Sequence, residues 1–295
     1  MPDQSPSHVP VMLAEVLQWL APKPGGIYFD GTLGGGGHTR ALAGLVEPGG
    51  YVIAVDRDPQ AIAAAERNLA GLPIKLAESD FADMPAVLDE VGIEAVDGVL
   101  LDVGLSSDQL ADSERGFSFD ADGALDLRFN PALGRSAADL VNRLDAERLA
   151  NVIYQYGEER YSRRIARAIV EARTQRPIST ARELAELVRR CVPRESRKNP
   201  IDPATRTFQA LRIAVNDELG SLERALAAVP ARLKPGGRIV VISFHSLEDR
   251  RVKEAFRQDG RYEVLTRKPV RATPEEVDVN PRARSAKLRA ASRAK

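Results

Sequence analysis

The chain has 295 residues, of which 43% are hydrophobic, with 42 basic and 42 acidic residues and a formal net charge of zero. This length and composition predict a soluble globular protein of one large or two modest domains, and no apolar run approaches the roughly 18 residues of a membrane span. The polar N-terminus does not resemble a secretory signal, and the single cysteine, Cys191, excludes a disulfide framework and a cysteine zinc site, so we expect a cytoplasmic protein.

The first predicted strand, at 27–30, is followed by a glycine-rich loop with four consecutive glycines and by a predicted helix at 38–46. A second strand at 51–55 then leads into Asp56. This order is typical of a nucleoside-binding sheet, because glycines let the backbone approach a ligand and the acid accepts hydrogen bonds from ribose hydroxyls. Thr39 stands where G-x-G-x-x-G requires glycine, so the spacing favours S-adenosylmethionine over a dinucleotide. A glycine-rich turn in an unrelated α/β protein is the alternative.

Two further strands are predicted near 73–78 and 97–102, with intervening helices near 58–70 and 84–91. Such alternation indicates an α/β fold with a parallel, doubly wound sheet. The rhythm then changes to amphipathic helical patterns at Ser136–Leu144, Ala146–Tyr156, Tyr161–Arg173 and Thr180–Cys191. We therefore expect residues 105–211 to form a helical insertion, and residues 1–104 and 212–295 to form the sheet domain around it.

The sheet resumes after a tight turn predicted at Leu233–Gly237, with strands near 238–244, 262–266 and 286–290. Ligands of open α/β sheets bind outside the carboxyl ends of the strands. Five polar side chains fall at such ends, namely Asp30, Asp56, Asp80, Asp102 and His245. Their convergence predicts a binding site at this edge of the sheet.

Several blocks of sequence together resemble one family. They include Asp30-Gly-Thr-Leu-Gly-Gly-Gly-Gly-His38, Leu101-Asp-Val-Gly-Leu-Ser-Ser107, Tyr156-Gly-Glu-Glu-Arg160, Pro203-Ala-Thr-Arg-Thr-Phe-Gln-Ala210, Ser243-Phe-His-Ser-Leu-Glu-Asp-Arg250 and Asn280-Pro-Arg-Ala-Arg-Ser285. The set, from residue 8 to about 290, is similar to the RsmH (MraW) family of ribosomal RNA small-subunit methyltransferases. One segment departs from the family, because the stretch between Arg267 and Asn280 is shorter than in many members.

The resemblance implies a class I S-adenosylmethionine-dependent methyltransferase fold with a helical substrate-recognition insertion. It also implies methylation of the N4 amino group of a cytidine in 16S ribosomal RNA, with ribosomal RNA or the small subunit as partner. Carried over by position, the cofactor contacts are Gly36, Gly37, His38, Asp56, Phe81, Asp102 and Gln109. We expect a monomer or homodimer that binds no metal and no membrane.

The candidate catalytic residues are Asp102, Ser107 and His245. A cytosine amino group is a weak nucleophile, so acceptors for its protons would help its lone pair to attack a well-aligned methyl group. Asp102 ends the fourth strand and either acts there or binds the methionine end of the cofactor, and Ser107 lies on the following loop. His245 contacts the base, relays a proton, or makes only a structural hydrogen bond.

Charge is distributed unevenly: residues 1–110 carry 16 acidic and 5 basic side chains, whereas residues 160–212 carry 14 basic and 5 acidic ones. Residues 261–295 carry 10 basic and 4 acidic side chains. Within the basic region, helical spacing relates Arg160, Arg163, Arg164 and Arg167, and a second cluster is formed by Arg189, Arg190, Arg194, Arg197 and Lys198. Phosphate contact is the favoured interpretation, and a solvated helical surface with ion pairs is the alternative.

Phe117 and Phe119 either stack on a splayed base or anchor their loop, and we interpret Cys191 as a small buried residue. The favoured function is N4 methylation of a ribosomal RNA cytidine. The alternatives are a methyltransferase acting on DNA or a small molecule, and a non-catalytic S-adenosylmethionine-binding RNA chaperone. A nicotinamide oxidoreductase is disfavoured by the glycine spacing.

Overall fold

The structure, a computed structural model, describes residues 10–119, 122–193 and 202–295. It divides into two compact units. The first, which we call the sheet unit, comprises Met1–Ser107 and Leu219–Lys295. The second, the helical unit, comprises Asp108–Glu218. No helix among the described residues is long and apolar enough to cross a membrane.

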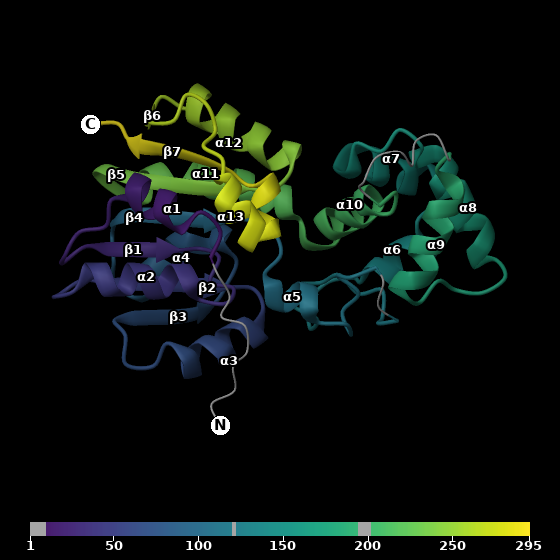
Figure 1. The fold of residues 1–295 in the computed structure, drawn as a ribbon, viewed down its shortest axis with the longest axis horizontal. Helices are drawn as coiled ribbons and strands as arrows, with labels where there is room; N and C mark the ends of the chain where they lie inside the picture. Colours follow the sequence, from purple (N-terminus) through teal and green to yellow (C-terminus); the bar gives the residue numbers. More distant parts are fainter. Residues whose placement is uncertain (1–9, 120–121, 194–201) are drawn as a thin grey trace. The chain divides into compact units, whose positions relative to one another are not determined.

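The sheet unit is built on a seven-stranded sheet with the strand order β3-β2-β1-β4-β5-β7-β6 (Figure 1). The strands are β1 Ile27–Asp30, β2 Tyr51–Asp56, β3 Ile74–Glu78, β4 Val96–Asp102, β5 Leu233–Ser243, β6 Tyr262–Val264 and β7 Lys287–Arg293. After β1 the chain builds outward through β2 and β3, and then returns so that β4 pairs with the other edge of β1. The carboxyl ends of β1 and β4 therefore flank a topological switch point, where open α/β sheets bind ligands.

Helices cover both faces of the sheet. They are α1 Leu13–Leu20, α2 Gly37–Val46, α3 Pro59–Asn68, α4 Met84–Glu90, α11 Glu218–Arg232, α12 Ser246–Gln258 and α13 Pro274–Val279, with 3₁₀ turns η1 Phe81–Asp83 and η3 Pro281–Ser285. One apolar core joins one face of the strands to α4, α11 and α12. The other core joins the opposite face to α1, α2, α3 and η3. Successive strand residues alternate between the two cores, as the pleat requires: in β4, Val99 and Leu101 enter the first and Leu100 the second.

The parallel arrangement predicted from the first four strands is confirmed and extends to β5, but one edge of the sheet is antiparallel. β7 runs antiparallel to both β5 and β6. Lys287, the first residue of β7, pairs with Ser243, the last residue of β5. The chain thus enters β7 at the carboxyl edge of the sheet, after passing through α13 and η3. A parallel β7 would instead require a crossover back to the opposite edge. As a result, η3 lies at the edge that carries the predicted site.

The strand predicted near 238–244 begins earlier than expected. β5 starts at Leu233 and so includes the residues that were predicted to form a tight turn at Leu233–Gly237. Val96 pairs with Leu233 but Gly98 pairs with Arg238, so the register shifts there. The Lys-Pro-Gly-Gly sequence is accommodated as an irregularity within β5, where Gly236 adopts φ +75°.

The helical unit contains α6 Ala137–Arg143, α7 Ala146–Gly157, α8 Ser162–Arg173, α9 Ala181–Cys191 and α10 Thr205–Asn216, and the short α5 Ser107–Ala111 leads into it. Local sequence accounts for where these helices begin. Ser136 and Thr180 cap α6 and α9 through capping boxes with Asp139 and Glu183. Helix α8 buries one apolar face, which includes Ile165 and Ile169, and leaves Arg163, Arg164 and Arg167 exposed.

Candidate active site

The glycine loop connects β1 to α2, and its glycines are required by conformation and by space. Gly34 and Gly36 adopt φ +47° and +76°, values that side chains rarely tolerate. A Cβ at Gly36 would lie 2.9 Å from Leu69 Cδ1, and one at Gly37 would contact Pro10 at 3.1 Å. The backbone of this loop therefore carries no side chains at Gly34, Gly36 and Gly37, and it packs closely against Leu69 and Pro10.

Asp56 ends β2 and is held by the glycine loop itself. Its Oδ2 accepts a hydrogen bond from the Gly34 amide at 2.8 Å, and its Oδ1 accepts one from the Asp58 amide at 2.9 Å. Burial raises the pKa of Asp56 to about 6, against the opposing effect of these two bonds. Each carboxylate oxygen can accept a second hydrogen bond, so the group retains one acceptor position on each oxygen.

Asp30 ends β1 and ties together three segments of the site. It is fully buried and accepts a hydrogen bond from the Thr39 hydroxyl of α2 at 2.6 Å. It also accepts from the Thr32 amide at 3.1 Å, while the Thr32 hydroxyl accepts from the Asp102 amide at 2.7 Å. Burial raises the pKa of Asp30. Its place is structural: it fixes the glycine loop and, through Thr32, the end of β4.

Asp102 ends β4, next to β1, and faces His38 from α2. Their closest atoms, Asp102 Oδ2 and His38 Nδ1, are 3.8 Å apart. His38 Nε2 lies 3.0 Å from the Val11 carbonyl oxygen, and because a carbonyl only accepts, Nε2 carries the proton in that bond. Burial raises the pKa of Asp102 to about 6, although His38 and Arg282 act in the opposite direction.

The other oxygen of Asp102 is the unusual atom of the site. Asp102 Oδ1 is buried and has no hydrogen-bond partner among the described residues. Buried polar atoms are nearly always paired, so an unpaired carboxylate oxygen at a ligand-binding edge indicates that a bound group supplies the missing donor. Asp102 Oδ1 is thus the acceptor that the structure leaves available.

Phe81 and Asp80 lie at the end of β3, in and before η1. Phe81 is half-buried and packs against the core, and a Cβ at Gly31 would lie 2.6 Å from its Cβ. The Asp80 carboxylate accepts from the Ser221 hydroxyl at 2.6 Å and the Ala82 amide at 3.0 Å, and pairs with Arg57 at 3.4 Å. Asp80 therefore anchors this corner, and Phe81 remains the predicted cofactor contact.

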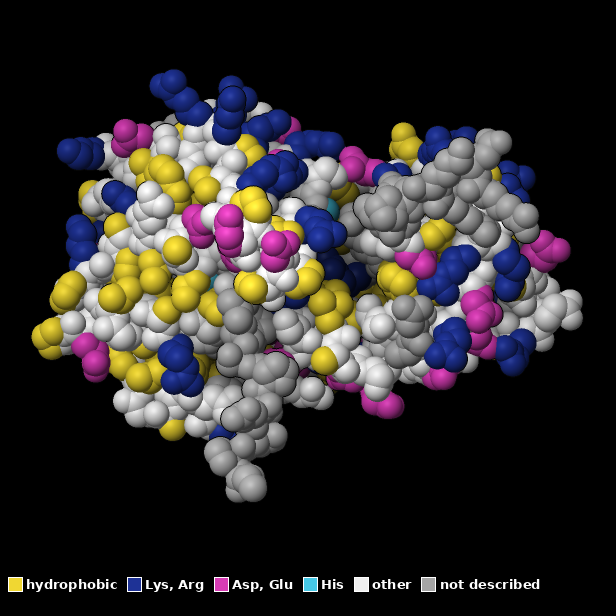
Figure 2. Space-filling view, viewed as in Figure 1, with side chains coloured by type: hydrophobic (Ala, Val, Ile, Leu, Met, Phe, Trp, Pro, Cys, Tyr) yellow, Lys and Arg dark blue, Asp and Glu magenta, His cyan; other side chains and the backbone are white. Residues whose placement is uncertain are grey.

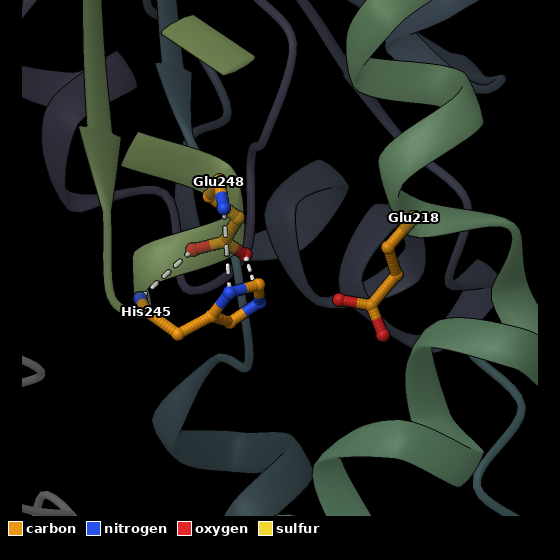
Figure 3. A group of neighbouring side chains, drawn as sticks. All are labelled: Glu218, His245 and Glu248. Atoms are coloured by element: carbon orange, nitrogen blue, oxygen red, sulfur yellow. Dashed lines mark hydrogen bonds and ion pairs between the residues drawn. The ribbon is translucent and has the colours of Figure 1, made fainter. Parts of the chain in front are cut away.

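Ser107 and His245, the other predicted catalytic residues, both have partners within the sheet unit. The Ser107 hydroxyl accepts a hydrogen bond from Arg282 Nη1 at 2.7 Å. His245 is the N-cap of α12, where Nδ1 accepts from the Glu248 amide at 3.4 Å and Nε2 lies 3.0 Å from Glu248 Oε1 (Figure 3). That second contact is an ion-pair distance without hydrogen-bond geometry, since Nε2 has no hydrogen-bond partner in the described chain. Catalytic roles for both residues stay predictions.

Gln109 belongs to the helical unit, in which it is buried, and its cofactor contact likewise stays a prediction. Phe117 and Phe119 make ring contacts within the same unit that anchor their loop. The Phe117 ring stacks on Phe129 with centroids 6.1 Å apart, and the Phe119 ring meets Phe208 edge-on at 5.5 Å. Cys191 is buried in the same unit, and burial raises the pKa of its thiol.

The arginines of the helical unit divide by their partners. Figure 2 shows basic side chains interspersed with acidic ones over the visible face of this unit, and several form ion pairs, such as Arg143–Asp139 and Arg189–Asp202. Arg163, Arg164 and Arg167 are exposed on α8, and the only bond that the structure gives their guanidinium groups in the described chain is from Arg167 Nε to the Arg163 carbonyl, at 3.2 Å. Arg160 lies in the turn before α8, so the predicted stripe begins two residues before the helix. Arg194, Arg197 and Lys198 lie outside the described residues.

Two residues of the site were not singled out from the sequence. Thr32 received no role beyond the loop spacing, although its hydroxyl accepts from the Asp102 amide. Arg282 stood within the Asn280–Ser285 block and received no role, yet it contacts the loop after β4. In the sequence, only the basic residues of that block could have pointed to Arg282. The approach of η3 to the end of β4 depends on the antiparallel direction of β7, which the sequence pattern does not reveal.

Taken together, the switch-point loop, the acid after β2 and the available carboxylate after β4 define an α/β enzyme that binds a nucleoside-containing cofactor, of the class I methyltransferase type. The sequence pattern of the MraW methylase family matches residues 5–294 of this chain. The chain belongs to this family. It is a methyltransferase, and S-adenosylmethionine is its methyl donor.

Curated relatives cover nearly the whole chain. A protein of Acidobacterium capsulatum is 50% identical and covers 97% of this chain and 98% of its own length. Proteins of Geobacter sulfurreducens and Rhodopirellula baltica are each 51% identical and cover 97% of this chain, with 99% and 91% of their own lengths matched. All three are named ribosomal RNA small subunit methyltransferase H.

Proposed function

We propose that this enzyme transfers a methyl group from S-adenosylmethionine to the N4 amino group of a cytidine in small-subunit ribosomal RNA. The names of the relatives support the RNA substrate, and the family supports the N4 position. The observation that carries the proposal is Asp102 Oδ1, a buried carboxylate oxygen without a partner in the described residues, at the end of β4. A cytosine amino group has two protons to donate, and its delocalised lone pair becomes nucleophilic when an acceptor holds them.

The residues present fit the cofactor. Asp56 keeps two acceptor positions, which match two ribose hydroxyls, and the positive φ values of Gly34 and Gly36 keep side chains away from the loop. Phe81 would contact the adenine, and Gly36, Gly37, His38 and Gln109 would complete the contacts. When bound, S-adenosylmethionine supplies an activated methyl group on sulfur, so the protein need only orient and desolvate the reactants.

Within this reaction Asp102 accepts a proton from the amino nitrogen, and Ser107 and His245 lie on the segments that follow β4 and β5. The family's N4 chemistry needs no cysteine nucleophile, whereas methylation at cytosine C5 does. Cys191 is buried in the helical unit and burial raises the pKa of its thiol, which disfavours it as the nucleophile that C5 methylation needs.

The helical unit is the proposed RNA-recognition domain, with the exposed arginines of α8 as phosphate contacts. The partner is ribosomal RNA or the small subunit, the enzyme works in the cytoplasm, and it is a monomer or a homodimer. DNA or small-molecule methylation and a non-catalytic RNA-chaperone role are the competing functions. The acid that ends β2 together with the Asp102 carboxylate that ends β4 argues against loss of catalysis, and so against the last.

The decisive measurement is mass spectrometry of nucleosides from small-subunit RNA of cells with and without this gene. We expect N4-methylated cytidine to disappear in the deletion and to return with the wild-type gene, but not with Asp102→Asn. Unchanged N4-methylcytidine in the deletion strain, or a C5-methylated product, would show that the proposed function is wrong. Incubating the purified enzyme with DNA and with RNA tests the first rival directly.

A further inference from the structure

The loop after the β4 carboxylate is held by a side chain from near the other end of the chain. Arg282 lies in η3, where Nη1 donates to the Ser107 hydroxyl at 2.7 Å and Nη2 donates to the Leu105 carbonyl. Both acceptors lie within five residues of Asp102. Two donors of one planar guanidinium thus fix two points of the same short loop, a geometry that the single ammonium of lysine does not reproduce.

The Arg282 guanidinium lies over an aromatic ring. Arg282 is half-buried, and its Cζ lies 6.0 Å from the centre of the Phe244 ring. Phe244 in turn packs against Gly104, where φ is +115° and a Cβ would lie 3.2 Å from Phe244 Cδ2. The absence of a side chain at Gly104 therefore lets the Phe244 ring pack close to the start of the loop.

Arg282 also acts on the charge of the Asp102 carboxyl. Its positive charge lowers the pKa of Asp102, as does that of a protonated His38 from α2. Asp30 from β1 and Glu248 from α12 raise it, and burial raises it most, to about 6. Arg282 is the permanently charged cation in this set, because an arginine does not lose its proton in proteins.

We propose that Arg282 is a positioning residue for methyl transfer, which fixes the 105–107 loop that follows Asp102 and supplies a permanent positive charge that acts on the acceptor carboxylate. The inference rests on the proposed function, because that reaction gives Asp102 its role as proton acceptor. It assigns Arg282 no contact with the substrate or the cofactor.

Two substitutions separate the two effects. Arg282→Gln removes the charge and retains one hydrogen-bonding group, whereas Arg282→Lys retains the charge and loses the paired donors. At pH 7 we expect Arg282→Gln to lower kcat by roughly 10- to 100-fold, the scale of a catalytic group displaced by about 1 Å. The Kd for S-adenosylmethionine should change by less than about threefold, since the loop that Arg282 holds through Ser107 and Leu105 is not the glycine loop.

The pH dependence of kcat tests the effect of the Arg282 charge on the Asp102 carboxylate. Since kcat reports groups in the enzyme–substrate complex, its acid limb should move to higher pH in Arg282→Gln and stay at the wild-type position in Arg282→Lys. Arg284→Gln is the matched control, because Arg284 is an exposed arginine of the same 3₁₀ turn and its loss should leave kcat and the acid limb unchanged. A folded Arg282→Gln enzyme with wild-type kcat and acid limb would overturn the inference. So would an acid limb that moves equally in both variants.

A direct titration keeps this inference separate from the proposed function. The Asp102 carboxyl is followed by carbon NMR, assigned by its loss in Asp102→Asn, in wild type and both Arg282 variants. The pKa of Asp102 should rise in Arg282→Gln and return toward wild type in Arg282→Lys, whichever substrate the enzyme uses. An unchanged Asp102 pKa in Arg282→Gln contradicts the inference, whereas a wild-type enzyme inactive on small-subunit RNA contradicts the proposed function. If Arg282→Gln does not fold, Arg282→Lys decides alone, because wild-type kcat there would show that the paired donors are dispensable.

Discussion

Two carboxylates of the site have their pKa raised to about 6 by burial, and they differ in how their oxygens are used. Asp56 gives one acceptor position on each oxygen to a backbone amide, and so keeps the glycine loop in register. Asp102 has one oxygen near His38 and one with no partner in the described chain. The first arrangement suits a ligand that donates two hydrogen bonds, and the second suits a group that gives up a proton.

Replacing Asp56 by Ala should weaken S-adenosylmethionine binding by roughly 2–4 kcal/mol, since hydrogen bonds to a charged group contribute about 1.5–3 kcal/mol each and do not add fully. Titration calorimetry at pH 8, where the carboxyl is ionised, measures the loss. Asp89→Ala, which removes an exposed carboxylate paired with Arg232, is the control and should bind normally. Wild-type affinity in a folded Asp56→Ala protein would remove Asp56 from the cofactor site.

The substitution Asp102→Asn should make the protein more stable and less active. The folded-state pKa of Asp102 is raised, so its contribution to folding is fully favourable below the unfolded value near 4 and is lost as pH rises through about 6. Without cofactor, Asp102→Asn should therefore be more stable than wild type above pH 7, by up to about 3 kcal/mol, and the difference should shrink toward pH 4. Its kcat should fall by roughly 10²–10⁴-fold, while wild-type activity should rise with pH through about 6.

Urea unfolding at several pH values and single-turnover kinetics test the two halves of this prediction. Asp97→Asn is the matched control on the same strand, because Asp97 is paired with Lys234 at 2.7 Å and should give no stabilisation. A large rise in the cofactor Kd with a near-normal saturated rate would make Asp102 a ligand of the methionine end instead.

At the scale of elements, α8 shows how one helix separates packing from charge. Its apolar face, with Ile165, Ala166 and Ile169, is buried, so the exposed Arg163, Arg164 and Arg167 contribute little to the core. Several exposed arginines elsewhere in the helical unit pair with acids of their own or a neighbouring segment, as Arg143 does with Asp139 and Arg182 with Asp122. The charges of α8 are thus better placed for an external polyanion than for local ion pairs.

Changing Arg163, Arg164 and Arg167 to Gln should weaken RNA binding and flatten its salt dependence. The log–log slope should shrink by up to about 0.7 for each lost single-strand phosphate contact. Affinity for S-adenosylmethionine should not change, because the glycine loop belongs to the sheet unit. The control triple variant removes the ion-paired Arg143, Arg148 and Arg182, and it should cost some stability without changing the slope. An unchanged slope in the α8 variant would mean that this face of the helix does not bind RNA.

At the scale of the whole molecule, both apolar cores of the sheet belong to one unit although the chain leaves it for more than a hundred residues. Every residue of the two cores lies in Met1–Ser107 or Leu219–Lys295. The chain departs after β4, at the ligand-binding edge of the sheet, and returns through α11, which packs on the same face as α4. An insertion at that position leaves the cores intact and places new sequence directly after β4.

The sequence by itself determined the features that depend on neighbours along the chain. The glycine loop, the strand ends at Asp30, Asp56 and Asp102, and the start of α9 at Thr180 are set by hydrophobic runs, glycine conformation and capping, all of which act within a few residues. The family resemblance added the chemistry, because its motifs fall on those same strand ends.

Only the tertiary structure decided what depends on segments meeting through space. The reversed β7 cannot be deduced from the apolar pattern of its own strand, and it brings η3 and Arg282 to the loop after β4. The proton on His38 Nε2 follows from the Val11 carbonyl, and the unpaired Oδ1 of Asp102 follows from which groups do not reach it in the described chain. Local sequence specifies strands and helices, whereas the pairing of distant strands and the burial that shifts a pKa arise only when the whole sheet is assembled.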